Sequence, residues 1–248
     1  MKTVGVLGGM GPLATVDFLN RLVKLTPVHK DQEHIKLIIY MNPQIPDRTR
    51  AIMKKGKSPT TELKKSLRFL ENSGADFIVI PCVTVHFWLN EARKAVRIPV
   101  LDIVELVITN IKKKKGIKRV GILATTGTLS TEILQRPLLD LGYQVIIPER
   151  EIQKNLVMKT IYGIKKGKPN REMKPLFRKS CTHLIKKGAQ LIILACTELP
   201  ILYSGFRSSI PILDINELLA LETIKYAGKK GIEKEDVTLN SFQGLKRC

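Results

Sequence analysis

The chain contains a long internal repeat, which restricts the folds open to it. Residues 74–103 and 188–215 follow one plan: Gly-Ala, an apolar run, a cysteine eight residues after the glycine, then Ile-Pro and an aspartate. Internal self-similarity marks a duplicated structural unit. The sequence therefore predicts two copies of one half, whose corresponding residues are Cys82 with Cys196 and Asp102 with Asp214.

Each copy alternates predicted strands with predicted helices. A second repeated pair, 2–15 and 118–131, places a glycine-containing turn after the first strand of each half. From apolar runs and turn residues, strands are predicted over 3–8, 35–41, 77–80, 99–101, 119–124, 144–147, 191–195 and 211–213. Helices are predicted after Pro12, from about Thr84, and over 59–73, 103–114, 151–166, 171–187 and 215–229.

This β-then-α order predicts an α/β fold of two similar domains. Each domain is expected to be a doubly wound parallel sheet, and the two are expected to be related by pseudo-two-fold symmetry. We assign residues 1–102 plus 215–248 to the first domain and residues 103–214 to the second. Ligands bind such sheets beyond the carboxyl ends of the strands. Because both cysteines follow strands, we expect the active site in the cleft between the domains.

Composition limits the partners of the chain. The net charge of +20 comes from 42 Lys and Arg against 22 Asp and Glu, but the lysines are spread over helices and turns. Only five Tyr, seven Phe and one Trp accompany them, without the aromatic-basic pattern that stacks bases. We therefore expect a solvated lysine-rich surface and no nucleic-acid partner. No apolar run reaches 18 residues, so no membrane span is expected. Four cysteines without a C-x-x-C pair favour a cytoplasmic protein with reduced thiols.

Cys82 and Cys196 are the candidate catalytic pair. A cysteine at a strand end beside a helix N-terminus is expected to have a lowered pKa and to act as a base near neutral pH. For either cysteine alone, a small buried packing residue is the ordinary interpretation. The repeat, with Thr84 and Thr197 beside the thiols, favours a shared task instead. Two thiols related by two-fold symmetry suit removal of a proton from one face of a carbon and delivery of a proton to the other.

Other uses of the cysteines are less favoured. His86 lies four residues after Cys82, but Pro200 stands at that place in the second copy, which disfavours a Cys-His nucleophile. Cys181 and Cys248 have no symmetry mate, and we interpret them as a helix packing residue and a free terminal residue. No His or Cys recurs at ligand spacing, so no metal site is predicted.

Two loops of the first half carry further candidate residues. The turn over 8–12 lacks the G-x-G-x-x-G pattern, so no NAD site is predicted, but its backbone N–H groups are expected to be free for an anion such as a carboxylate. The loop over 42–49 contains two prolines and the cluster Asp47-Arg48-Thr49. On local sequence alone this loop is a proline-rich turn with an Asx cap.

Seven segments in order carry a family resemblance that covers nearly the whole chain: MKTVGVLGGMGPLAT, DQEH, NPQIPDRT, GADFIVIPC-x-T-x-H, LATTGT, IKKG and CTELP. In them the chain resembles the aspartate/glutamate racemases that work without pyridoxal phosphate, and among these the aspartate racemases. The resemblance implies two α/β domains of pseudo-two-fold symmetry, a homodimer, no cofactor, and cysteine acid/base catalysis at the α-carbon of an acidic amino acid. The net positive charge would then draw in a dianionic substrate.

Carried over by position, the resemblance implies a role for each candidate residue. Cys82 and Cys196 are the implied acid/base pair, while Arg48 and Lys165 are the implied ligands of the side-chain carboxylate. Val83, Thr84, Val85 and Thr126 are implied to lie around the α-carboxylate and the amino group, and Met10, Thr49 and Thr197 are further implied substrate-binding residues.

One residue departs from the family pattern. Val83 follows Cys82 where the family usually has an asparagine that hydrogen-bonds the substrate carboxylate. Loss of such a contact costs on the order of 1–3 kcal/mol. Three functions therefore stay open: a racemase of an acidic amino acid, most of all aspartate; a related two-cysteine isomerase or decarboxylase that acts on another carboxylate; and a member of the fold with impaired catalysis.

Overall fold

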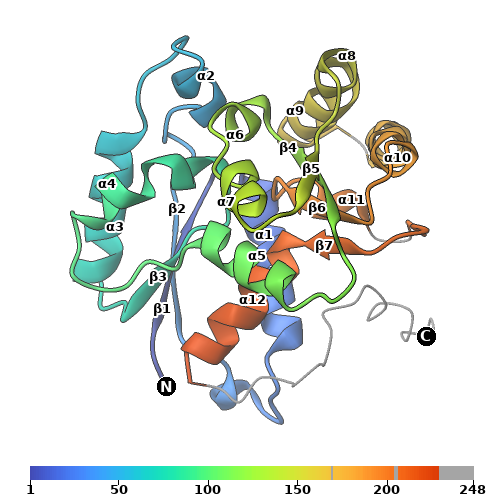
Figure 1. Cartoon of the computed structure of the whole chain (residues 1–248). Helices are drawn as coiled ribbons and strands as arrows, with labels where there is room; N and C mark the ends of the chain where they lie inside the picture. Colours follow the sequence, from blue (N-terminus) through green and yellow to red (C-terminus); the bar gives the residue numbers. More distant parts are fainter. Residues whose placement is uncertain (169, 204–205, 229–248) are drawn as a thin grey trace.

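The strands form two separate parallel sheets in the computed structural model of the chain, which describes residues 1–168, 170–203 and 206–228 (Figure 1). The first sheet has the order β2-β1-β3 and the second the order β5-β4-β6-β7. The strands are β1 Val4–Gly8, β2 Leu37–Met41, β3 Phe77–Val79, β4 Arg119–Ala124, β5 Gln144–Ile146, β6 Leu191–Ala195 and β7 Ile212–Asp214. The first strand of each half lies between the second and the third. The predicted α/β fold with two parallel sheets is confirmed.

The predicted strand over 99–101 is only a single bridge between Val100 and Ile78. The backbone on both sides of this bridge does not continue the sheet. The N–H groups of Arg97 and Ile98 donate to the Glu71 carboxylate, at 2.7 and 3.1 Å. Pro99 has no N–H to donate, and a helix begins soon after the bridge. In the second half, the same position holds the full strand β7.

Helices connect the strands and cover the sheets (Figure 1). Before β4 in the chain they are α1 Pro12–Leu25, α2 Arg48–Ile52, α3 Thr60–Asn72, α4 Leu89–Arg93 and α5 Ile103–Lys112. After β4 they are α6 Thr126–Ser130, α7 Gln135–Asp140, α8 Arg150–Ile152, α9 Lys159–Lys165, α10 Asn170–Lys186, α11 Pro200–Tyr203 and α12 Ile215–Tyr226. The described residues also contain the 3-10 turns Asp31–Glu33 and Thr84–Trp88 and a π-helical segment, Gln153–Met158.

Two of the predicted helices differ in kind from the expectation. The helix expected near Thr84 begins as the 3-10 turn and becomes α-helical only at Leu89. The single helix expected over 151–166 consists of α8, a π-helical segment Gln153–Met158 and α9. The proline-rich loop ends, as expected, in an Asx cap, because the Asp47 side chain accepts from the N–H of Arg50 at the start of α2.

The two repeated aspartates have matching structural roles. The side chain of Asp102 accepts from the N–H groups of Val104 and Glu105 and caps α5. The side chain of Asp214 accepts from the N–H groups of Asn216 and Glu217 and caps α12. Each cap satisfies backbone donors that have no partner within the helix. The aspartates of the repeat therefore start a helix in both halves, and Asp214 also ends the strand β7.

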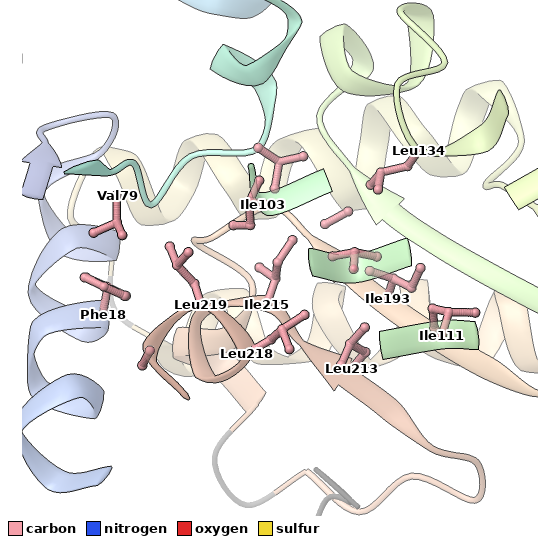
Figure 2. Packing of buried hydrophobic residues seen from close by; sticks show 14 of the residues in the cluster. Phe18, Val79, Ile103, Ile111, Leu134, Ile193, Leu213, Ile215, Leu218 and Leu219 are labelled. Carbon is pink, nitrogen blue, oxygen red and sulfur yellow. The ribbon is translucent and has the colours of Figure 1, made fainter. Parts of the chain in front are cut away.

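One large apolar core joins the two halves. Its members include Phe18 and Val79 from the first half and Ile193 and Leu213 from the second. Figure 2 shows the α12 residue Leu219 between these groups. Two further clusters cover the other faces of the sheets, one in each half. Because the largest core is shared, the halves are held in a fixed relation, and residues of both can meet in one site. The predicted domain boundaries stay a prediction. The segment 229–248, which contains Cys248, lies outside the described residues, so the expectation for Cys248 also stays a prediction.

A buried ionic network adds to this connection. The Arg21 guanidinium of α1 lies 2.8 Å from both Asp17 and Asp214, and 3.7 Å from Glu217. Asn216 donates to Asp17 at 2.8 Å. Burial raises the pKa of Asp214 to about 6, although Arg21 acts in the opposite direction. The network therefore contains a carboxyl group that is easier to protonate in the folded chain than in the unfolded one.

The Asp214→Asn variant tests this pKa. A folded-state pKa raised from 3.8 to about 6 means that protonation of Asp214 favours the folded state as the pH falls through about 6. As the pH is lowered from 7 to 4, the free energy of unfolding of the wild type should therefore rise by up to about 3 kcal/mol more than that of Asp214→Asn. Urea unfolding of both proteins across this pH range measures the difference. Asp102→Asn, at the equivalent cap, is the control, and a pH-independent difference for Asp214→Asn would contradict the assignment.

Candidate active site

Both candidate thiols lie at the carboxyl ends of corresponding strands. Cys196 follows β6 directly, and Cys82 follows β3 after Ile80 and Pro81. Both cysteines are buried, with 5% of Cys82 and 4% of Cys196 exposed. β3 and β6 each pair with the first strand of their half. The fold thus places the two thiols at equivalent positions of the two sheets, as the repeat predicts.

Cys196 rests as a thiol. Its Sγ donates to Oε2 of Glu198 at 2.9 Å. Burial, followed by the charge of Glu198, raises the pKa of Cys196 well above its ordinary value, and the opposing effect of Lys165 is smaller. The expectation of a lowered pKa is therefore wrong for Cys196, because burial and a neighbouring carboxylate outweigh any helix dipole. In this state Cys196 is a proton donor.

Glu198 is a site residue that the sequence did not reveal. It is 2% exposed, its Oε1 accepts from the N–H of Gly11 at 3.1 Å, and Lys165 Nζ lies 3.6 Å from the same oxygen. The Gly9 N–H is also engaged, by the Thr15 hydroxyl at 3.0 Å. The expectation that the N–H groups of the turn over 8–12 are free is thus wrong for both glycines. One sequence signal could have pointed to Glu198. It lies two residues after Cys196, whereas the first copy has the uncharged Thr84 two residues after Cys82.

Lys165 lies within electrostatic reach of both thiols. Burial and, to a lesser extent, the charge of Arg48 would lower the pKa of Lys165, but the Glu198 carboxylate, followed by Cys196 and Cys82, raises it above its ordinary value. The ammonium form is therefore held at neutral pH. Lys165 thus contacts the same carboxylate, that of Glu198, that accepts from the Cys196 thiol.

Arg48 is a buried cation held by backbone carbonyls. Its Nη1 donates to the carbonyls of Ile45 and Pro46, and its Nη2 donates to that of Met10, all at 3.1 Å. The residue is 8% exposed, and none of the ion pairs formed by the described residues includes it. Arginine presents five donors, so two remain for a ligand. A buried charge without a counterion is costly unless an anion binds it; the guanidinium is therefore suited to a carboxylate.

Threonines connect the two halves next to Cys82. The Thr84 hydroxyl lies 3.0 Å from that of Thr125 and 2.8 Å from that of Thr128. Close by, a Cβ on Gly127 would stand 2.9 Å from Cα of Thr49, so α2 and α6 approach at a position that only glycine fits. These contacts bring Thr49 and Thr84 of the first half to the N-terminal end of α6, where Thr126 lies.

The other candidate residues are placed less directly. Val83 packs in the core shared by the halves, and Val85 and Met10 pack in the cluster of the first half, so only their backbones are suited to polar contacts. The N–H of Thr126 donates to Sδ of Met158 at 3.2 Å. Thr197 is buried, and its carbonyl accepts from Asn216 at 3.1 Å.

His86 is not arranged as a base for Cys82. Burial lowers the pKa of His86, so the ring is neutral, and its Nδ1 lies 2.7 Å from the carbonyl oxygen of Cys82. This contact is a hydrogen bond that Nδ1–H donates to the backbone rather than to the sulfur. His86 therefore supports the turn that carries Cys82.

The shared core, the strand-end thiols and the buried Arg48 define a two-lobed α/β protein whose candidate site residues come from both lobes. A model of the Asp/Glu/Hydantoin racemase family matches residues 7–223. The chain belongs to this family. The predicted family and the predicted class of enzyme, an isomerase, are confirmed.

Individual relatives agree with this assignment. The broad specificity amino-acid racemase RacX of Bacillus subtilis (strain 168) is 30% identical over 89% of this chain and 96% of its own length. The structure of Picrophilus torridus aspartate racemase matches with a TM-score of 0.83 and 32% identity, over 93% of this chain and 96% of its own. An aspartate racemase homologue from Pyrococcus horikoshii OT3 matches with a TM-score of 0.73 and 22% identity, over 92% of this chain and 100% of its own, and supports the fold alone.

Proposed function

We propose that the chain racemises an acidic amino acid, most of all aspartate, by transfer of the α-proton between Cys82 and Cys196. The observation that carries the proposal is Arg48, a buried cation without an acidic partner among the described residues. The names of two relatives, an aspartate racemase and a broad specificity amino-acid racemase, support it.

The reaction needs one base and one acid on opposite faces of the α-carbon. The thiolate of one cysteine takes the α-proton, and the electron pair of the broken C–H bond passes into the α-carboxylate. The thiol of the other cysteine then gives its proton to the opposite face. Because Cys196 rests protonated, it is the acid in the direction in which Cys82 is the base. The reverse reaction exchanges these roles.

The cations around the thiols have separate tasks in this proposal. Arg48 binds the side-chain carboxylate of the substrate, which supplies a counterion that none of the described acidic residues provides. The resemblance assigns Lys165 to the same carboxylate, but Lys165 is already paired with Glu198, so its charge is partly balanced before substrate binds. Lys165 stabilises the negative charge that develops on the α-carboxylate of the substrate or on either sulfur. Met10, Thr49, Val83, Thr84, Val85, Thr126 and Thr197 stay proposed as the walls of the substrate site.

Glu198 is proposed to hold the proton of Cys196 when Cys196 must act as the base. Its Oε2 accepts directly from the Cys196 thiol, so the proton needs to move only along an existing hydrogen bond. The Gly11 N–H and Lys165 contact the other oxygen, Oε1, and so hold the carboxylate with Oε2 towards the thiol. Glu198 is a positioning residue in this account, since it acts through Cys196.

The Glu198→Gln variant tests this role through the pKa of one thiol. The Glu198 charge raises the pKa of Cys196, so removal of the charge should lower that pKa. We expect the pH midpoint of Cys196 alkylation by iodoacetamide, followed by peptide mass spectrometry, to fall. Glu149→Gln, a change of an exposed carboxylate paired with Lys187, is the control and should leave the midpoint in place. An unchanged midpoint in Glu198→Gln would show that the carboxylate does not act on Cys196.

A substrate panel tests the proposed function and its alternatives. Purified protein is incubated separately with L- and D-aspartate, glutamate, alanine, lysine, maleate and an arylmalonate, and the products are separated by chiral chromatography. We expect interconversion of the aspartate enantiomers with the highest kcat/KM. A preference for neutral or basic amino acids would favour a broader racemase, whereas turnover of maleate or arylmalonate alone would favour the second function. Absence of turnover with every substrate would contradict the proposal and would favour the third function, a member of the fold with impaired catalysis.

The assembly and the compartment of the protein also stay proposals. We propose a homodimer in the cytoplasm, where reducing conditions keep both thiols free. Within the part of the chain that the structure describes, no helix has the length and apolar character to cross a membrane. Light scattering coupled to size exclusion tests the dimer, and a mass of one chain, about 27.9 kDa, would contradict it.

A further inference from the structure

A lysine-lined cavity, whose lining includes neither Cys82 nor Cys196, lies where α9 and α10 pack side by side (Figure 1). Its volume is about 280 Å³, close to the lower limit for small-molecule sites. Four lysines line it: Lys154, Lys159, Lys166 and Lys168. The remaining lining comes mainly from two thioethers and one phenol ring, those of Met158, Met173 and Tyr162. Because the four lysines are exposed and Met173 is buried, the cavity combines a cationic rim with an apolar floor.

The π-helical segment explains why these lysines converge. In a regular α-helix, residues five apart point about 140° away from each other. The segment Gln153–Met158 is π-helical, with bonds that span five residues, so Lys154 and Lys159 come onto one face. Lys166 follows Lys159 by seven residues, which is two α-helical turns. Gly167, with a φ of +72°, then turns the chain and leaves Lys168 beside the same opening.

The charge on the rim is largely uncompensated. Lys168 lies 3.7 Å from Glu172, but Lys154, Lys159 and Lys166 take part in none of the ion pairs among the described residues. Ammonium groups gathered around one small cavity repel each other, and an anion between them relieves this repulsion. Lysine binds phosphate as a point charge, without the planar fork that arginine offers to carboxylates. The apolar floor fits a ring or short chain next to the anion.

We propose that this cavity is a second ligand site, specific for a small organic phosphate that bears a ring or a short apolar chain. The phosphate lies among the four lysines, and the apolar part lies on Met158, Tyr162 and Met173. Two of these side chains also contact the candidate active site. Met158 accepts from the N–H of Thr126, and the Tyr162 ring centroid lies 5.9 Å from Lys165 Nζ. A bound phosphate therefore touches residues that touch the substrate site.

Calorimetric titration with phenyl phosphate, at a fixed ionic strength of about 0.15 M, tests the site. We expect saturable binding that the double variant Lys154→Gln/Lys159→Gln weakens by about tenfold or more. Lys112→Gln/Lys113→Gln, which removes the same charge from the exposed end of α5, is the matched control and should change Kd by less than about twofold. Inorganic phosphate should bind about tenfold more weakly than phenyl phosphate, because it makes no use of the apolar floor.

The same titrations also contain the results that would overturn the proposal. Equal weakening in both double variants would mean that phenyl phosphate binds the lysine-rich surface without a defined site. Equal affinity for inorganic phosphate would remove the apolar floor from the site, and tighter binding of tricarballylate than of phenyl phosphate would overturn the choice of phosphate. The readout is binding, so it stands whether or not the chain racemises aspartate. Circular dichroism of both double variants, expected to match the wild type because these lysines are exposed, checks that the fold is intact.

Discussion

Replacement of Cys82 or Cys196 with alanine is expected to lower the rate of aspartate racemisation by about 10³-fold. Each substitution removes either the base or the acid for a given direction, and water would have to replace it. Because each thiol is small and lies at a strand end, the alanine variants should keep the fold. The measurement is kcat in both directions, from L- to D-aspartate and from D- to L-aspartate, by chiral chromatography.

Cys181 provides the matched control for this prediction. It is buried in α10, and burial raises its pKa to about 12, so it is a packing residue that does not ionise near neutral pH. Cys181→Ala should retain racemisation within about twofold and lose on the order of 1 kcal/mol of stability. A Cys82→Ala or Cys196→Ala variant that racemises aspartate as fast as Cys181→Ala would exclude a two-thiol mechanism.

The second large effect is expected at Arg48. The Arg48→Gln substitution removes the only cation that the proposal assigns to the side-chain carboxylate. Loss of a charged hydrogen bond costs about 1.5–3 kcal/mol, so kcat/KM for aspartate should fall by about 10- to 150-fold. The fall should be much smaller for alanine, which has no side-chain carboxylate. The ratio of the two values of kcat/KM is therefore the measurement, and it does not depend on the fraction of folded protein.

Two further variants make this prediction specific. Arg50→Gln lies in the same helix, α2, but its side chain is exposed, so the aspartate-to-alanine ratio should stay within about twofold. Arg48→Lys keeps the charge and loses the fork that binds the carbonyls of Met10, Ile45 and Pro46. It should therefore give an intermediate ratio. If Arg48→Gln lowers kcat/KM for aspartate and alanine equally, Arg48 serves the fold rather than recognition of the acidic side chain.

Much of the fold was open to prediction from the repeat. A strand, a cysteine and a capping aspartate recur in each half, and their order is enough to define two parallel sheets with thiols at strand ends. The strand over 119–124 and the strand over 191–195 were predicted with their observed bounds. Continuous apolar runs between turn residues made these buried strands easy to recognise. The single bridge at Val100 was not open to prediction, because it depends on Glu71, which is distant in sequence.

The electrostatics of the candidate site were harder to predict. A helix N-terminus beside Cys196 suggested a lowered pKa, but the fold buries the thiol and brings Glu198 to 2.9 Å from it. The position of Gly11 against Glu198 joins residues 187 positions apart, and no local pattern indicates such a contact. The π-helical segment was equally hidden, since its sequence has the composition of an ordinary helix. Contacts between the halves therefore decide the chemistry that local sequence leaves open.

Deuterium incorporation early in the reaction tests the two-thiol account most directly. The protein is incubated with L-aspartate in deuterated water. Before about 10% conversion, both enantiomers are separated and their deuterium content is measured by mass spectrometry. If opposed acid and base act at the α-carbon, nearly all of the D-aspartate carries α-deuterium while the remaining L-aspartate keeps its proton. The reaction from D-aspartate should give the mirror-image result. Equal deuterium in substrate and product, from either enantiomer, would show that one base serves both faces and would contradict the account.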